Sequence, residues 1–72
     1  MTERMETLTT REFEVLALLA DGKENKEIAA LLGLQSTTVR GHLESIYLKL
    51  QVTNRVEATR EWLRLSGSPG DE

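Results

Sequence analysis

Residues 36 to 50 read STTVRGHLESIYLKL, a stretch that predicts a helix with two faces of opposite character. The apolar residues on one face recur at the spacing that a helix buries against a core. They are Val39, Leu43, Ile46 and Leu50. The opposite face is polar and short-chained, and Arg40 is the only arginine in its first turns. A helix that needed only solubility would carry more long charged side chains, so this face predicts a recognition surface.

Upstream of that stretch, residues 10 to 21 predict a first helix. Thr9 and Glu12 have the spacing of a capping box, in which each side chain accepts a hydrogen bond from the other residue's free backbone N–H. Leu8 and Phe13 have the spacing of a hydrophobic staple. The stripe expected to be buried comprises Val15, Leu16, Leu19 and Ala20. This helix is therefore predicted to be scaffold.

A second helix is predicted over residues 26 to 32, capped by Asn25 and ended by Gly33. Only two residues separate Gly33 from the stretch that begins at Ser36. Two short helices joined by a tight turn that contains glycine form a helix-turn-helix unit. The same spacing also fits an ordinary corner between helices in a small bundle. Spacing alone therefore leaves both DNA binding and a purely structural role open.

A fourth helix is predicted over residues 55 to 65, because Asn54 and Glu57 resemble the start of a second capping box. Its stripe is Val56, Thr59 and Leu63, flanked by Ala58 and Trp62. The large aromatic ring of this helix is either part of the core or an exposed anchor of an interface. The predicted fold is all-α, with four helices and a helix-turn-helix formed by the second and third.

The domain is expected to span residues 8 to 66 of the 72-residue chain. A flexible lead-in is predicted over residues 1 to 7, which show no periodicity. A disordered tail is predicted over residues 67 to 72, which are turn formers and acids. A chain of this length is long enough for one small domain.

The composition argues against several functional classes. There is no cysteine, so neither a disulfide nor a thiolate site can exist, and the single histidine, His42, argues against a zinc site. No activated nucleophile, paired acid or cofactor loop is recognisable. We therefore expect no enzyme, no cofactor, no metal and no small-molecule ligand. An apolar run of about eighteen residues and a signal-peptide pattern are both missing, so a cytoplasmic protein without membrane contact is expected.

The charge is unevenly distributed along the chain, although its net value of −3 argues at first sight against a nucleic-acid partner. Residues 1 to 22 carry −3, residues 23 to 55 carry +2, and residues 56 to 72 carry −2. The positive section contains the predicted helix-turn-helix. This asymmetry favours an anionic partner for the middle of the chain.

Five short motifs occur in a fixed order. They are LTTRE at 8 to 12, NKEIA at 25 to 29, TVRGHL at 38 to 43, KL at 49 to 50 and NRVEA at 54 to 58. In these motifs the chain resembles the LuxR-type (NarL/FixJ/GerE) DNA-binding domain from about Leu8 to Leu65. The resemblance implies a transcriptional regulator, standing alone or as part of a longer response regulator. It also implies that the third helix enters the major groove of double-stranded DNA and that the fourth often pairs two copies.

The resemblance assigns roles to individual residues. The expected base contacts are Arg40, Gly41 and Glu44, and the expected phosphate contacts are Asn25, Lys26, Thr37, Thr38 and Lys49. The expected dimer interface is Val56, Thr59, Trp62 and Leu63, in a weak homodimer that forms chiefly on DNA. RNA polymerase is a further candidate partner. An arginine can donate two parallel hydrogen bonds to guanine, whereas a glutamate can accept from cytosine but is repelled by phosphates.

Some positions depart from the family pattern. Gln35 stands where a serine N-cap is usual, so the cap is expected to move to Ser36. Arg55 is expected either to contact a phosphate or to form an ion pair with Glu12. Two other functions stay open: a helix-turn-helix fold that serves as a protein-interaction module, and a promoter-binding domain like region 4 of sigma factors.

Overall fold

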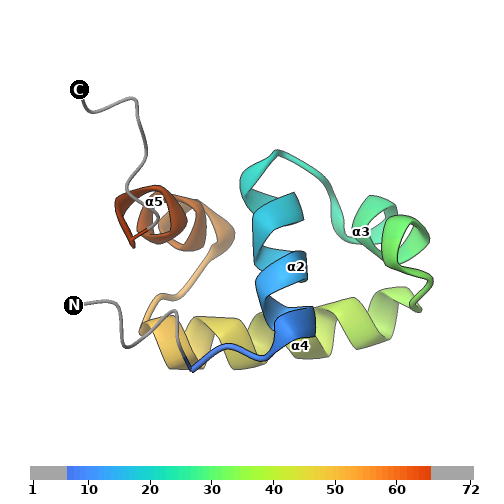
Figure 1. Cartoon of the computed structure of the whole chain (residues 1–72), viewed down its shortest axis with the longest axis horizontal. Coiled ribbons are helices and arrows are strands. Elements are labelled where there is room, and N and C mark those ends of the chain that lie inside the picture. Colours follow the sequence, from blue (N-terminus) through green and yellow to red (C-terminus); the bar gives the residue numbers. More distant parts are fainter. Residues whose placement is uncertain (1–6, 66–72) are drawn as a thin grey trace.

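The computed structural model describes residues 7 to 65, which form four helices and no strand (Figure 1). They are α2 (Thr10–Ala20), α3 (Asn25–Leu32), α4 (Ser36–Leu50) and α5 (Arg55–Leu65). The all-α prediction and the order of the helices are confirmed, and each predicted boundary agrees to within one residue. The predicted tail, and all of the predicted lead-in except Thr7, lie outside the described residues.

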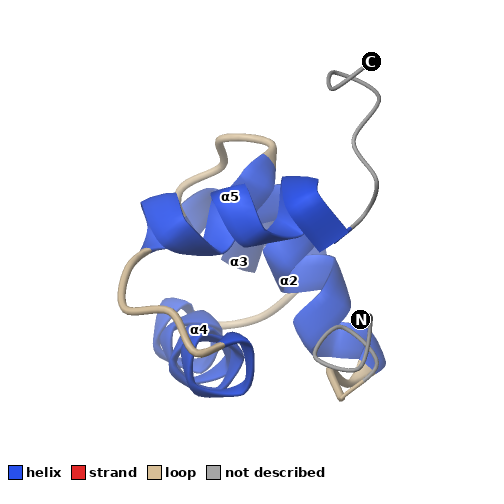
Figure 2. Ribbon diagram, turned by 90° about the vertical axis from the view of Figure 1, so that its left-hand side faces the viewer, coloured by secondary structure: helices blue, strands red, loops and turns tan. Residues whose placement is uncertain are grey.

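The long helix α4 organises the arrangement of the other three. In Figure 1 it runs along the bottom, with α3 above its N-terminal end, α2 above its middle and α5 above its C-terminal end. Figure 2 looks along α4 and shows the other helices on the same side of it. One side of α4 therefore packs on the domain, while the opposite side stays uncovered by the described residues.

The core draws on all four helices. Its buried apolar residues are Val15, Leu16, Leu19, Ile28, Ala29, Val39, Leu43, Ile46, Leu50 and Ala58. The predicted stripe of α4 is entirely buried, because the 3.6-residue period of a helix keeps such positions on one face. α5 buries Ala58 completely, whereas its Val56 and Leu63 are 61% and 46% exposed.

The capping box at the start of α2 is confirmed. The Thr9 hydroxyl accepts a hydrogen bond from the Glu12 backbone N–H at 3.1 Å, and Glu12 Oε1 accepts one from the Thr9 N–H at 3.0 Å. One turn further on, the Phe13 ring meets the Trp62 ring of α5 edge to face, with centroids 5.0 Å apart. This contact fixes α5 against α2.

Two predicted caps are wrong. α3 is capped by Glu24, whose backbone N–H donates to Glu27 Oε1 at 2.8 Å, so Asn25 is already inside the helix. α4 is capped by Gln35, which makes no side-chain cap hydrogen bond, so the cap does not move to Ser36. In both cases the cap residue has an extended backbone, and its carbonyl accepts the first hydrogen bond of the helix.

The turn between α3 and α4 is as tight as predicted. Gly33 has a left-handed backbone with φ of 70°, and the Leu34 N–H donates to the Ala29 carbonyl at 2.8 Å. At the other end of α4, Gln51 takes the same left-handed conformation with φ of 60°. A non-glycine residue is strained there by about 1 kcal/mol. No helix within residues 7 to 65 is both long enough and apolar enough to cross a membrane.

Candidate nucleic-acid interface

The uncovered side of α4 carries a second stripe, opposite the buried one. Thr37, Gly41, Glu44 and Leu48 recur at i, i+4, i+7 and i+11, and all four are exposed. Arg40 and Thr38 flank this stripe and are exposed as well. The buried stripe holds α4 rigidly in the domain, because Val39, Ile46 and Leu50 have no exposed surface. The structure therefore presents a fixed helix face to solvent, which is polar in its first turns, as the sequence predicted, and ends in Leu48.

Arg40 is available to an external partner. Within residues 7 to 65 its guanidinium takes part in no ion pair and no side-chain hydrogen bond. One residue later, a Cβ atom built on Gly41 would meet nothing within 4 Å. Packing inside the domain therefore does not require this glycine. Because glycine has no side chain, the backbone of α4 can approach another molecule closely at this position.

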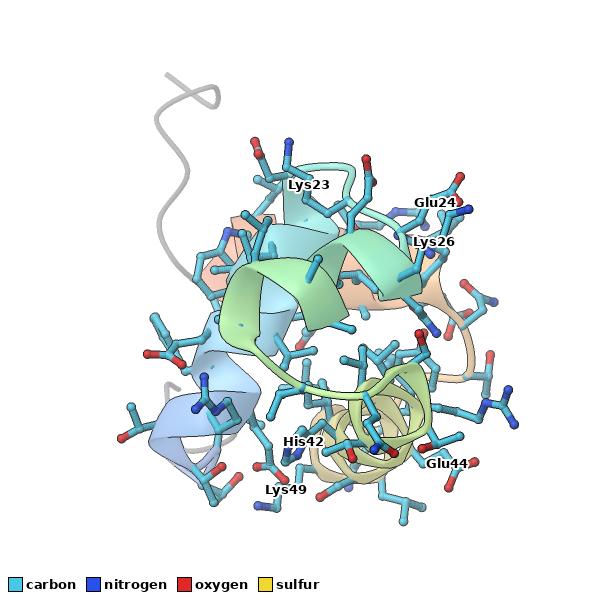
Figure 3. The ribbon with its side chains drawn as sticks, turned by 90° about the vertical axis from the view of Figure 1, so that its right-hand side faces the viewer. Lys23, Glu24, Lys26, His42, Glu44 and Lys49 are labelled. Atoms are coloured by element: carbon cyan, nitrogen blue, oxygen red, sulfur yellow. The ribbon has the colours of Figure 1, made fainter. Side chains whose placement is uncertain are left out.

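The start of α3 adds two of the predicted phosphate contacts. Lys26 is exposed and takes part in no ion pair within the described residues. Asn25 is half-buried, and its Oδ1 is buried without a hydrogen-bond partner in the same part of the chain. In Figure 3, Lys26 and Glu44 lie on the right-hand side of the view, whereas His42 and Lys49 lie on the other side of α4.

A partly buried polar cluster joins α2 to the side of α4 that carries Lys49. Glu12 is 5% exposed, and its Oε1 accepts a hydrogen bond from Lys49 Nζ at 2.7 Å. Its Oε2 accepts one from the Ser45 hydroxyl, also at 2.7 Å. Lys49 Nζ also donates to the Thr7 carbonyl at 3.0 Å. Although burial by itself raises the pKa of Glu12, the hydrogen bonds from Lys49, Ser45 and Thr9 outweigh it and lower the pKa to about 2.

This cluster corrects one expectation and qualifies another. The predicted ion pair between Arg55 and Glu12 is wrong, because Arg55 Nη2 instead donates to the Lys23 carbonyl at 2.7 Å. Lys49, a predicted phosphate contact, uses two of its three N–H groups inside the domain. Only one of its N–H groups is therefore left for a contact outside the described residues. Sequence reasoning missed the role of Ser45, although its i, i+4 spacing from Lys49 already placed the two on one helix face.

The predicted dimer residues are divided between two environments. Val56, Thr59 and Leu63 line an open groove of about 660 Å³ together with Leu19, Ala20, Gly22, Glu24, Arg55 and Arg60. Trp62 does not line this groove. It is partly buried against the core and packs on Phe13. The apolar groove and the aromatic ring of α5 thus lie on different faces of the helix.

Comparison with known proteins gives a consistent result. The family described as bacterial regulatory proteins, luxR family, matches residues 6 to 62. The chain is 57% identical over 51 residues to the transcriptional regulatory protein DesR of Bacillus subtilis, which covers 71% of this chain and 26% of DesR. It is 43% identical over 61 residues to the nitrate/nitrite response regulator protein NarP of Escherichia coli, which covers 85% of this chain and 28% of NarP.

A third relative is the putative HTH-type transcriptional regulator YhjB of Escherichia coli. It is 44% identical over 54 residues, which cover 75% of this chain and 27% of YhjB. The chain thus spans about a quarter of the length of these curated relatives. No solved structure matches the chain at a significant level.

Proposed function

Because this chain belongs to the luxR family of bacterial regulatory proteins, we propose that it binds double-stranded DNA sequence-specifically, as the DNA-binding part of a transcriptional regulator. The observation that carries the proposal is the exposed face of α4, where Arg40 has no partner among the described residues and lies next to the stripe of Thr37, Gly41 and Glu44. The names of the relatives, which include a nitrate/nitrite response regulator, support a place in a longer response regulator. We propose that this regulator is cytoplasmic, where its DNA would be found.

In the proposed complex α4 lies in the major groove. Arg40 donates two hydrogen bonds to guanine O6 and N7, Gly41 lets the helix approach the base edges, and Glu44 accepts from cytosine N4. The hydroxyl groups of Thr37 and Thr38 donate to phosphates. Phosphate contacts of this kind fix the register of the helix and carry no sequence information themselves.

Two further groups of phosphate contacts come from outside the first turns of α4. Asn25 and Lys26 approach one strand from the start of α3, and Lys49 offers its remaining N–H from the last turn of α4. These two lysines are among the five positively charged residues between residues 23 and 55.

The charge of Lys26 allows a test of the proposal by its salt dependence. We expect Lys26→Ala to weaken binding to all duplex sequences about equally and to reduce the slope of log affinity against log salt by about 1, because one fewer counterion is released. Fluorescence anisotropy with a random duplex between about 50 and 200 mM salt measures this slope.

The matched control is Lys23→Ala, which removes the same charge three residues earlier, where Lys23 lies 3.7 Å from Asp21. This variant should keep the wild-type slope. If the wild-type chain shows no salt-dependent association with DNA, the protein-interaction function is favoured instead. The sigma-factor function is not proposed further, because the family match includes the NRVEA segment at residues 54 to 58.

We also propose that two copies bind adjacent half-sites through α5, in a homodimer that is weak in solution. The groove that contains Val56, Thr59 and Leu63 supports this, since it leaves apolar surface uncovered by the described residues. Trp62 contributes indirectly, because its ring fixes α5 to α2 through Phe13. Binding to neighbouring half-sites raises the effective concentration, so a small contact is sufficient on DNA.

We expect Val56→Asp to keep the fold and the binding of one half-site. Binding to a paired site should weaken about tenfold, because the contact between the two bound copies is lost. Footprinting on single and paired sites measures this loss. Leu31→Asp is the control, since Leu31 is 60% exposed on α3, nearly the same as Val56, and lies outside the groove. Equal affinities of both variants for the paired site would refute α5 as the joint.

A further inference from the structure

Leu48 is an exposed apolar residue on the proposed DNA-binding face. Its exposed fraction of 81% is the highest among the large apolar side chains of residues 7 to 65. Single exposed leucines are common on protein surfaces and need no function. The position of Leu48 is what distinguishes it, because it continues the outward stripe one turn after Glu44 and about two turns after Gly41.

The backbone holds Leu48 in a fixed place relative to the other residues of this face. Its neighbours Ile46 and Leu50 on the opposite side of α4 have no exposed surface, so the last turns of the helix are anchored in the core. One helical turn advances about 5.4 Å, which is between one and two base-pair steps of about 3.4 Å. A helix that follows the major groove therefore brings Leu48 one or two base pairs beyond the pair that faces Glu44.

The depth of approach also favours a base contact by Leu48. Gly41 has no side chain, and the space beside it is open. The backbone of α4 can therefore come close to the groove floor along this stripe. A leucine side chain two turns away projects further from the helix axis than glycine or threonine, so it reaches the base edges when α4 lies at that depth.

The chemistry of a leucine limits what it can recognise. Its side chain has no hydrogen-bonding group, and contact with a phosphate would bring it no favourable interaction. The apolar feature that base edges present in the major groove is the C5-methyl group of thymine. We infer that Leu48 reads thymine by packing on this methyl group, one or two base pairs beyond the pair at Glu44. This inference rests on the proposed function.

The test compares thymine with deoxyuridine, which keeps the same base pairing and lacks only the methyl group. The whole chain first selects its preferred site from a randomised duplex pool, and each thymine of that site is then replaced in turn. For the wild-type chain we expect the replacement of one thymine, beyond the pair at Glu44, to weaken binding about fourfold. This is the change in affinity expected when one buried methyl group is lost. Leu48→Ala should bind the thymine and deoxyuridine sites equally.

Leu31→Ala is the control, because it shortens another exposed leucine, on α3, and should keep the fourfold preference. Circular dichroism checks that both variants remain helical. The inference is overturned if Leu48→Ala keeps the preference for thymine, or if the wild-type chain shows none. A chain that selects no sequence at all would refute the proposed function itself. If the chain selects a site but its preference for thymine does not depend on Leu48, only the role of Leu48 is refuted.

Discussion

Glu12→Ala should lower the free energy of unfolding by about 3 kcal/mol, because it leaves three donors without their acceptor in a partly buried site. Lys49 Nζ, the Ser45 hydroxyl and the Thr9 N–H all donate to this carboxylate. Two of these donors lie on α4 and one precedes α2, so the variant loosens the contact that holds the proposed recognition helix against the first helix. Small domains have little stability in reserve, so a loss of this size is readily measured by urea denaturation.

Glu14→Ala is the matched control for this variant. It removes a carboxylate of the same helix whose side chain is 46% exposed and pairs with Arg11 at 3.1 Å. Exposed pairs of this kind contribute less than about 1 kcal/mol, so the control should lie close to the wild type. If both variants lost the same amount, the cluster around Glu12 would have no special role.

The low pKa of Glu12 also predicts how stability depends on pH. Its pKa is about 2 in the folded chain, below the ordinary value of 4.5 that applies when the chain is unfolded. The stabilisation is therefore complete above pH 4.5 and is lost as the pH falls towards 2. We expect the free energy of unfolding of the wild-type chain to fall by about 2 to 3 kcal/mol more than that of Glu12→Gln across this window. Parallel curves for the two proteins would contradict the assignment.

Arg40→Ala should weaken binding to the selected DNA site by about 1 to 3 kcal/mol and leave the fold unchanged. The guanidinium is exposed and has no ion pair within residues 7 to 65, so its removal costs the domain no internal contact. The expected loss comes from two parallel hydrogen bonds to guanine. Binding isotherms on the selected site, together with circular dichroism, measure the two effects separately.

Arg40→Lys tests the geometry of this contact, because it keeps the charge but cannot form the same bidentate pair. We expect it to bind random DNA like the wild type and to lose most of the preference for the selected site. Arg64→Ala on α5 is a further control, since Arg64 is exposed and pairs with Glu61. Equal affinity of Arg40→Ala and the wild type for the selected site would remove Arg40 from the base contacts.

The features that sequence could predict are those that depend on neighbouring residues. The buried stripe of α4 and the capping box between Thr9 and Glu12 are set by the 3.6-residue period and by a spacing of three residues, so both could be read directly. The exposure of Arg40, Gly41 and Glu44 follows from the same period. Their contacts with bases stay predictions, because the partner is a second molecule.

Contacts between distant residues could not be predicted in the same way. The sequence predicts the cap that Glu12 makes with Thr9 and leaves an ion pair with Arg55 open. The further partners of Glu12, Ser45 and Lys49, follow 33 and 37 residues later. Which of several cations meets a given carboxylate depends on how α2 crosses α4, and this crossing depends on the whole core. For the same reason, the sequence leaves open whether Trp62 belongs to the core or anchors an interface, and only the structure shows that it is partly buried and packs on Phe13.

The two opposite stripes of α4 bear on how such a domain can evolve. Val39, Leu43 and Ile46 face the core, while Thr37, Gly41 and Glu44 face solvent. Substitutions at exposed positions usually change the free energy of unfolding by less than about 0.5 kcal/mol. Mutations on the outer stripe can therefore accumulate while the core, and with it the fold, stays the same. If this stripe contacts DNA bases as proposed, a lineage of such domains can acquire new operators by single substitutions while the folded scaffold is inherited unchanged.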